Sequence, residues 1–370
     1  MEGGKGKQLA LPPPAASISA VFSNDDLLRE ILVHVGFPTF LVRAALVSER
    51  WLRHAADPAF LRRFRALHPP HLLGFYVAGV GAQRQLFLPF SQAPELAAAV
   101  NRCKFDDSFG ESSRVVDCRN GRRLLFERSN NTSRYAVWGP LRPAPTMDGA
   151  DGIIIAVLTI SGLKVSAEVY VPQSGVWVVH ATAGTLVPRA AAPIGFVVTK
   201  AHGRHYMVSK GLFGPKSGYI FGLDLATMSI FVVKVPDSVR VIGRTTVKLF
   251  CGEDSGLFLV YGEGSQLSVW HRRNHSDATS DWILVDTITV REACNRCENV
   301  LVLAVGDNAE FVFVGLEASR VFICVDMRSR TENVFDVPIE CDMRYLSIMP
   351  YMMVWPPVFP ALNENHEQGE

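Results

Sequence analysis

Apolar side chains between residues 21 and 67 recur at the spacing of helices. One face of a helix over residues 25–35 would carry Leu27, Leu28, Ile31, Leu32 and Val35. We expect Ser23 to cap this helix, with Asp26 three residues later as its return partner. Short helices are also expected at residues 39–47 and 48–56, and another after Asp57-Pro58, where aspartate would cap and proline would open the first turn. Residues 21–67 are therefore predicted to form a small helical domain.

The pattern changes at Leu72 to short apolar runs separated by glycine and polar turns. Residues 91–101 form the one helix expected in this part. Many short strands at regular spacing predict a sandwich, a barrel or a propeller. The expected strands are residues 72–77, 123–127, 135–138, 153–160, 165–171, 175–180, 194–199, 206–209, 219–223, 229–235, 246–251, 257–261, 266–271, 282–287, 300–304, 311–314, 321–325 and 331–337.

An internal repeat favours the propeller among these folds. Residues 221–236 resemble residues 323–338: in both, an aspartate (Asp224, Asp326) ends a strand, and a proline (Pro236, Pro338) follows twelve residues later. The copies lie 102 residues apart, which is about two units of 51. That period suits four-stranded blades of kelch length. We therefore expect a kelch-like β-propeller over residues 72–356, with a pair of sandwiches as the main alternative.

Composition and the two ends of the chain complete the outline. With 48% apolar residues, 20% charged residues and a net charge of +1, the chain is predicted to be globular, with neither nucleic acid nor a membrane as partner. Residues 1–20 are expected to be a disordered leader and residues 357–370 a polar tail. Seven cysteines and no visible export signal indicate free thiols in the cytoplasm or nucleus.

The helical segment resembles an F-box of plant F-box proteins. The resemblance is carried by residues 24–32 (NDDLLREIL), Pro38, Leu41, residues 46–51 (LVSERW) and the follow-on at residues 57–64 (DPAFLRRF). The strand-rich remainder is similar to the propeller-like domains associated with that family. Two positions depart from the family pattern: Ser23-Asn24 replaces the usual Leu-Pro, with Phe22 as a candidate substitute, and Glu49 replaces a basic residue.

The resemblance implies a non-catalytic substrate receptor of an SCF-type cullin–RING ubiquitin ligase. The F-box would dock on a Skp-type adaptor, and through it on cullin, while the β domain would bind a protein target. Neither a cofactor nor a metal is implied. A module of about 45 residues has little core of its own, so surplus apolar faces are expected to be covered by a partner. The expected adaptor-binding residues are Phe22, Leu27, Leu28, Ile31, Leu32, Pro38, Leu41, Val47 and Trp51.

Other interpretations remain open. The helices could simply cap the β domain, the propeller could be an interaction module outside any ligase, or it could be an enzyme. Cys294 and Cys297 have the spacing of half a zinc site, but no second close pair exists, so two ordinary thiols are the default. His202 and His205 are expected in a loop between strands, and the arginines at residues 50–65 on a solvated or adaptor-facing surface.

Overall fold

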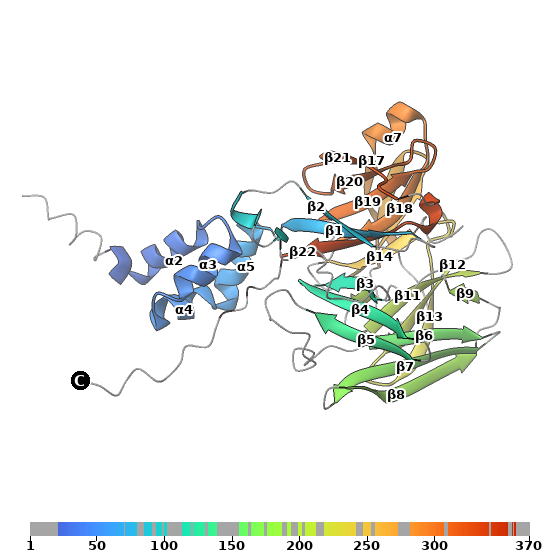
Figure 1. The fold of residues 1–370 in the computed structure, drawn as a ribbon, viewed down its shortest axis with the longest axis horizontal. Coiled ribbons are helices and arrows are strands. Elements are labelled where there is room, and N and C mark those ends of the chain that lie inside the picture. Colours follow the sequence, from blue (N-terminus) through green and yellow to red (C-terminus); the bar gives the residue numbers. More distant parts are fainter. Residues whose placement is uncertain are drawn as a thin grey trace, which may run out of the picture. The chain divides into compact units, whose positions relative to one another are not determined.

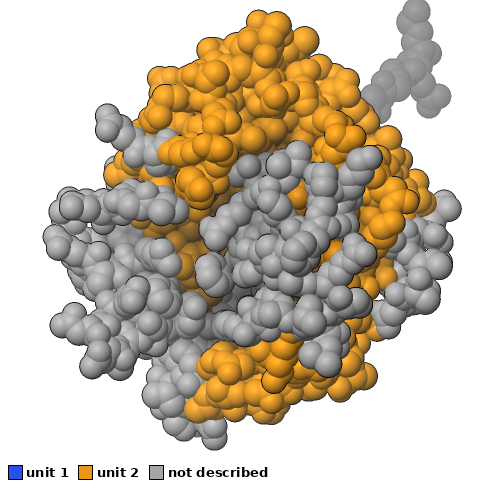
Figure 2. Space-filling model, turned by 90° about the vertical axis from the view of Figure 1, so that its right-hand side faces the viewer, with its two compact units in different colours: residues 1–71, 354–370 blue, residues 72–353 orange. Residues whose placement is uncertain are grey.

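The computed structural model divides the chain into two compact units, which we describe separately (Figure 1). Unit 1 comprises Met1–His71 and Val354–Glu370, and unit 2 comprises Leu72–Met353, drawn in orange in Figure 2. The structure describes residues 21–69, 71–79, 85–90, 94–97, 100–101, 113–119, 121–129, 132–138, 155–161, 164–173, 176–186, 191–193, 199–201, 204–211, 218–241, 247–252, 256–272, 282–306, 310–339, 342–353, 357 and 359.

Unit 1 is helical, as its apolar spacing predicted. Its helices are α2 (Asp25–Val33), α3 (Pro38–Ala45), α4 (Glu49–Ala55) and α5 (Pro58–Leu67). Side chains mark three of the starts: Asn24 accepts from the N–H groups of Asp26 and Leu27, Ser48 caps α4, and Asp57 caps α5. The prediction that Ser23 caps the first helix was therefore wrong by one residue. Among the described residues, no helix combines the length and apolar character needed to cross a bilayer.

The core of unit 1 is small and is built from one face of each helix. Leu28 and Leu32 of α2 meet Phe60 and Phe64 of α5, whose rings lie 6.2 Å apart between centroids. Phe359 from the C-terminal segment packs against the same cluster. The buried members of the cluster are Leu28, Leu32, Val33, Leu41, Ala45, Ala55, Phe60 and Phe64.

Unit 2 consists of antiparallel sheets. Three of them have three strands within the described residues: β2 (Leu86–Pro89), β1 (Leu72–Ala78) and β22 (Ser347–Met352); β3 (Ser113–Arg119), β4 (Arg122–Ser129) and β5 (Thr132–Trp138); and β6 (Ile155–Ser161), β7 (Lys164–Gln173) and β8 (Val176–Leu186).

The other three sheets each contain four consecutive strands. They are β10 (Thr199–Ala201), β11 (Arg204–Gly211), β12 (Gly218–Asp224) and β13 (Ser229–Lys234), with β9 (Ala191–Pro193) beside β11; β14 (Val247–Cys251), β15 (Leu257–Glu263), β16 (Gln266–Arg272) and β17 (Trp282–Thr289); and β18 (Val300–Val305), β19 (Phe311–Leu316), β20 (Val321–Asp326) and β21 (Glu332–Asp336). Short helical segments are η1 (Pro94–Leu96), α7 (Arg291–Arg296) and η3 (Met343–Tyr345).

The sheets of unit 2 follow one another in chain order and close on themselves. Strands of neighbouring sheets lie side by side: β10 lies beside β14, β14 beside β18, and β18 beside β22. The last strand, β22, pairs antiparallel with β1, so the end of the unit completes the sheet that its beginning opened. Successive small antiparallel sheets joined in this way form a β-propeller. The strand arrangement confirms the propeller; the kelch type stays a prediction.

The two copies of the internal repeat occupy equivalent places. Asp224 ends β12 and Asp326 ends β20, which hold the same place in the four-stranded runs β10–β13 and β18–β21. Strand β16 holds the same place in the sheet between them, β14–β17. The repeat therefore corresponds to one four-stranded sheet per unit.

Some elements were missed or misjudged from the sequence. The strands β2, β3, β9 and β22 were not predicted, and α7 shows that residues 91–101 are not the only helical segment of this part. The helix expected there is described in part, beginning with η1. Most of the strand expected at residues 194–199 lies outside the described residues.

Candidate functional site

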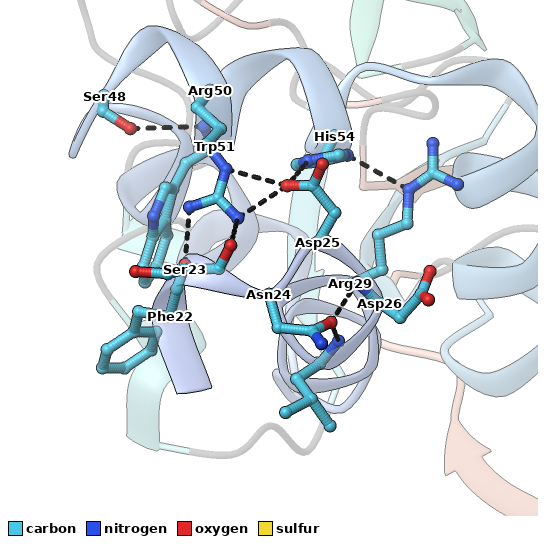
Figure 3. Close-up of polar contacts among 11 residues, drawn as sticks. Phe22, Ser23, Asn24, Asp25, Asp26, Arg29, Ser48, Arg50, Trp51 and His54 are labelled. Atoms are coloured by element: carbon cyan, nitrogen blue, oxygen red, sulfur yellow. Dashed lines mark hydrogen bonds and ion pairs between the residues drawn. The ribbon is translucent and has the colours of Figure 1, made fainter. Parts of the chain in front are cut away.

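An ion-pair network joins the beginning of α2 to α4 in unit 1 (Figure 3). Oδ1 of Asp25 accepts hydrogen bonds from Nε of Arg50 at 2.8 Å and from Nε2 of His54 at 2.9 Å. Nη2 of Arg50 lies 2.6 Å from the same oxygen. These contacts hold the two helices together at the end of α2 where the helix dipole already favours a carboxylate.

Arg50 also fixes the residues that precede α2. Its Nη1 donates to the carbonyl oxygen of Phe22 at 2.6 Å, and its Nη2 donates to that of Ser23 at 2.8 Å. A guanidinium presents several donors in a rigid fork, which is the geometry needed to reach two carbonyls and a carboxylate at once. The entry into α2 is thus set by a residue of α4.

The two partners of His54 indicate the tautomer of its neutral imidazole. Nε of Arg29 donates to Nδ1 of His54 at 3.1 Å, and because arginine can only donate, Nδ1 must be the acceptor. Nε2 therefore carries the hydrogen that is donated to Asp25. The hydrogen bond from Arg50, followed by that from His54, holds the pKa of Asp25 below its ordinary value of 3.8.

Large apolar side chains are left exposed beside this network. Leu27 and Ile31, one turn apart on α2, are 46% and 39% exposed, and Val47, which precedes α4, is 65% exposed. The ring of Phe22, itself partly exposed, packs on the half-buried Trp51 with centroids 5.4 Å apart. We call Phe22, Leu27, Ile31, Val47 and Trp51 the apolar surface of unit 1.

The remaining expected adaptor-binding residues lie in the interior. Leu28 and Leu41 are 0% exposed, Leu32 is 1% exposed and Pro38 is buried. Their side chains pack within unit 1 and have no surface to offer a partner. Of the nine residues expected to bind an adaptor, five form the apolar surface and four are buried; the adaptor contact itself stays a prediction.

Two residues that contribute to this candidate site were not identified from the sequence. Leu46, adjacent to Val47, is 54% exposed and enlarges the apolar area. Arg50 was grouped with a solvated basic cluster, yet it organises the start of α2. Arg53 and Arg63 of the same cluster pair with Glu49 at 3.1 Å and Glu30 at 2.8 Å. Glu49, which departs from the family pattern, therefore has a positively charged partner, Arg53, in the same helix.

The other constellations do not assemble into a site within the described residues. No three histidine, cysteine or acidic side chains of that part group in a way that would hold a metal. Arg204 and His205 begin β11 and so belong to a strand, with the preceding two residues outside the described part. Cys294 and Cys297 lie at the end of α7, and both are exposed.

Comparisons with known proteins give a family for the propeller. Residues 146–359, more than half of the chain, match the model of the family described as F-box protein AT5G49610-like, beta-propeller. A comparison with curated proteins finds no match. The match lies almost wholly in unit 2.

Solved structures show only distant likeness. The chain is similar to the β-propeller domain of Cps50 (Swd1) from Myceliophteria thermophila at 10% identity and a TM-score of 0.31, covering 62% of this chain and 86% of that one. Regucalcin, a calcium-binding protein from Agrobacterium tumefaciens, gives 12% identity and a TM-score of 0.33 over 61% of this chain and 74% of that one. Such low similarity says nothing about what this chain binds.

Proposed function

The chain belongs to the AT5G49610-like β-propeller family of F-box proteins, and we propose that it is the substrate-recognition subunit of an SCF-type cullin–RING ubiquitin ligase. In this proposal unit 1 docks on a Skp-type adaptor, and the adaptor links it to cullin. Unit 2 binds the protein to be ubiquitinated. The chain itself supplies no catalytic group, since ubiquitin transfer is carried out by the other subunits.

The exposed apolar surface of unit 1 is the observation that carries the adaptor step. Leu27, Ile31 and Val47 keep between 39% and 65% of their area in contact with solvent, although they belong to a unit with a small core. Burying a side chain of this size completely stabilises a complex by about 1.5–3 kcal/mol. A partner that covers the surface would therefore gain, from each residue, the part of this energy that corresponds to its exposed fraction.

The Phe22–Trp51 pair is the best anchor within that surface. Aromatic residues in the centre of an interface commonly cost about 2 kcal/mol or more when they are truncated. Arg50 holds the Phe22 carbonyl and the carboxylate of Asp25, so the ring of Phe22 is positioned before any partner arrives. Positioning in advance lowers the entropy lost on binding.

The contribution of unit 2 is to raise the concentration of a target near the ubiquitin-loaded conjugating enzyme. Joining two binding units in one chain turns the second encounter into an intramolecular one, with an effective concentration in the millimolar range for short flexible connections. A repeat of about 51 residues supports blades of kelch length for this unit.

Co-purification with a Skp-type adaptor tests the adaptor step. We compare the wild-type chain with the double variant Ile31→Asp/Val47→Asp, which puts two carboxylates on the apolar surface. The matched control is Leu67→Asp, because Leu67 is 52% exposed in the same unit but lies at the end of α5. The wild type and the control should retain the adaptor, and the double variant should lose it while its circular dichroism stays unchanged.

A protein-interaction module that never joins a ligase is the second candidate. It is favoured by Ser23-Asn24, which stands where the family usually has Leu-Pro. This candidate predicts that the wild-type chain recovers no adaptor at all. Equal recovery of adaptor by the wild type and the double variant would instead place the contact elsewhere and contradict the proposed surface.

A further inference from the structure

The short helix α7 is tied at both ends to the sheet of β18–β21. At its beginning, the carboxylate of Glu332 on β21 accepts hydrogen bonds from the backbone N–H groups of Arg291 at 2.7 Å and Glu292 at 3.1 Å. Just after its end, Glu298 accepts from the N–H groups of Ala318 and Ser319 at 2.8 and 3.1 Å. The helix is therefore held in place while its outer side faces solvent.

Two cysteines occupy the final turn of this fixed helix. Cys294 lies within α7, and Cys297 follows it in a left-handed conformation with φ of 54°. Both are exposed, whereas Cys118 and Cys324 are buried and Cys251 is half-buried. Burial raises the pKa of the Cys324 thiol and so suppresses its reactive thiolate. Among the cysteines of the described residues, the α7 pair is the accessible one.

Local contacts bring the second cysteine back towards the first. The N–H of Cys297 donates to the carbonyl oxygen of Cys294 at 3.2 Å, and Sγ of Cys297 lies 3.8 Å from that same oxygen. The Cys297 thiol thus points over the preceding turn rather than away from it. Disulfides join residues whose α-carbons are about 4.4–6.8 Å apart, a separation that three positions along a helical turn provide.

From this arrangement we propose that Cys294 and Cys297 form a reversible disulfide, which makes the end of α7 a redox-sensitive site on the propeller. The oxidant is a low-molecular-weight disulfide such as oxidised glutathione. The inference concerns unit 2 alone and goes beyond the proposed ligase function. A zinc site is the weaker use of the pair, because tetrahedral zinc needs two further ligands, and no suitable group of three side chains occurs within the described residues.

The reaction proceeds by two exchanges. The thiolate of one cysteine attacks a sulfur of glutathione disulfide, forming a mixed disulfide and releasing one glutathione thiolate, which takes up a proton. The thiolate of the second cysteine then attacks the protein sulfur of that mixed disulfide and releases the second glutathione. In sum, the two protein thiols lose two electrons and two protons, and one glutathione disulfide becomes two glutathione thiols.

Thiol trapping in glutathione buffers of increasing oxidised fraction tests this proposal. The full chain carries Cys103→Ser and Cys341→Ser, because those two cysteines lie outside the described residues. After equilibration, free thiols are blocked by alkylation, and the peptides spanning residues 291–298 are analysed by mass spectrometry. In reducing buffer we expect both cysteines of this segment to be alkylated. In oxidising buffer we expect neither to be alkylated, and the peptide mass to be two hydrogens lower than that of the dithiol form.

Single variants separate the proposed disulfide from simple thiol reactivity. In Cys294→Ser the remaining Cys297 should stop at the glutathione mixed disulfide, and Cys297→Ser should do the same at Cys294. Oxidation of the wild type should also slow amide hydrogen exchange of Cys297 and Glu298, since the covalent link restrains the turn. Two outcomes would overturn the proposal: both thiols remaining free in the most oxidising buffer, or glutathione accumulating on both cysteines of the wild type without ring closure.

Discussion

Oδ1 of Asp25 lies 2.8 Å from Nε of Arg50, across 25 positions of the chain. The contact joins the first turn of α2 to α4. Because Arg50 also binds the carbonyl oxygens of Phe22 and Ser23, one guanidinium fixes both the helix packing and the segment that precedes α2. The position of the Phe22 ring against Trp51 therefore depends on a polar network on the adjoining side (Figure 3).

Replacing Arg50 by lysine should loosen the start of α2. Lysine keeps the charge but has no rigid fork, so it cannot reach Asp25 and both carbonyls together. Loss of about 1–2 kcal/mol of hydrogen bonding should speed amide exchange around Leu27 and Leu28 by about 5–30-fold. Arg53→Lys is the control, because its ion pair with Glu49 is exposed and should change exchange little. Equal protection in wild type and Arg50→Lys would show that the network does not hold the helix.

Acid should weaken unit 1 through Asp25. Its pKa is lower in the folded state than in the unfolded chain, so the stability it contributes is complete above about pH 4 and is lost as the pH falls through the folded value. Asp25→Asn removes this dependence. The difference in thermal midpoint between wild type and Asp25→Asn should shrink as the pH falls below about 4. A difference that grows in acid would contradict the sign of the shift.

The helical spacing showed which side of α2 is apolar but not which part of it is buried. Leu27, Leu28, Ile31 and Leu32 form one wide stripe, and only the position of Phe60 and Phe64 on α5 decides that Leu28 and Leu32 face inward. The Arg50 contacts likewise could not be predicted from the sequence, because they join two segments that no local sequence pattern connects.

In unit 2 the blade could be predicted from the repeat, because the turn after the third strand of the run needs an aspartate and this aspartate recurs in the sequence. Oδ1 of Asp326 accepts from the N–H groups of Arg328 and Ser329, both at 2.8 Å, and Asp224 does the same in its own turn. Strand β22 has no such recurring aspartate in its sequence. Its partner β1 lies some 270 positions earlier, so its pairing depends on closure of the whole unit.

Asp326→Ala should destabilise the propeller by about 1 kcal/mol, because two backbone N–H groups lose their acceptor. Asp224→Ala should cost at least as much, because it also removes the acceptor of Arg204. That loss should lower the thermal midpoint by about 2–4 °C per variant in calorimetry. The two effects should add in the double variant, since the aspartates lie in different sheets.

Asparagine at the same positions distinguishes the turn from the charge. Asp326→Asn keeps the acceptor oxygen and should be nearly neutral. Asp224→Asn should cost more, because Oδ2 of Asp224 also accepts from Nε of Arg204 at 2.9 Å. Equal midpoints for the two asparagine variants would mean that the Arg204 pair contributes nothing.

Gly74→Ala should destabilise unit 2, since β1 passes too close to β2 for a methyl group. A Cβ at Gly74 would lie 2.6 Å from the carbonyl oxygen of Leu88 and 2.4 Å from the ring of Phe87. The backbone oxygen cannot move without disturbing the β1–β2 pairing, so we expect a loss of about 1–3 kcal/mol in urea unfolding. Gly306→Ala is the control: its Cβ would meet nothing nearer than 3.6 Å, and the substitution should be neutral or slightly stabilising. If Gly74→Ala unfolds at the same urea concentration as Gly306→Ala, β2 does not lie against Gly74 as described.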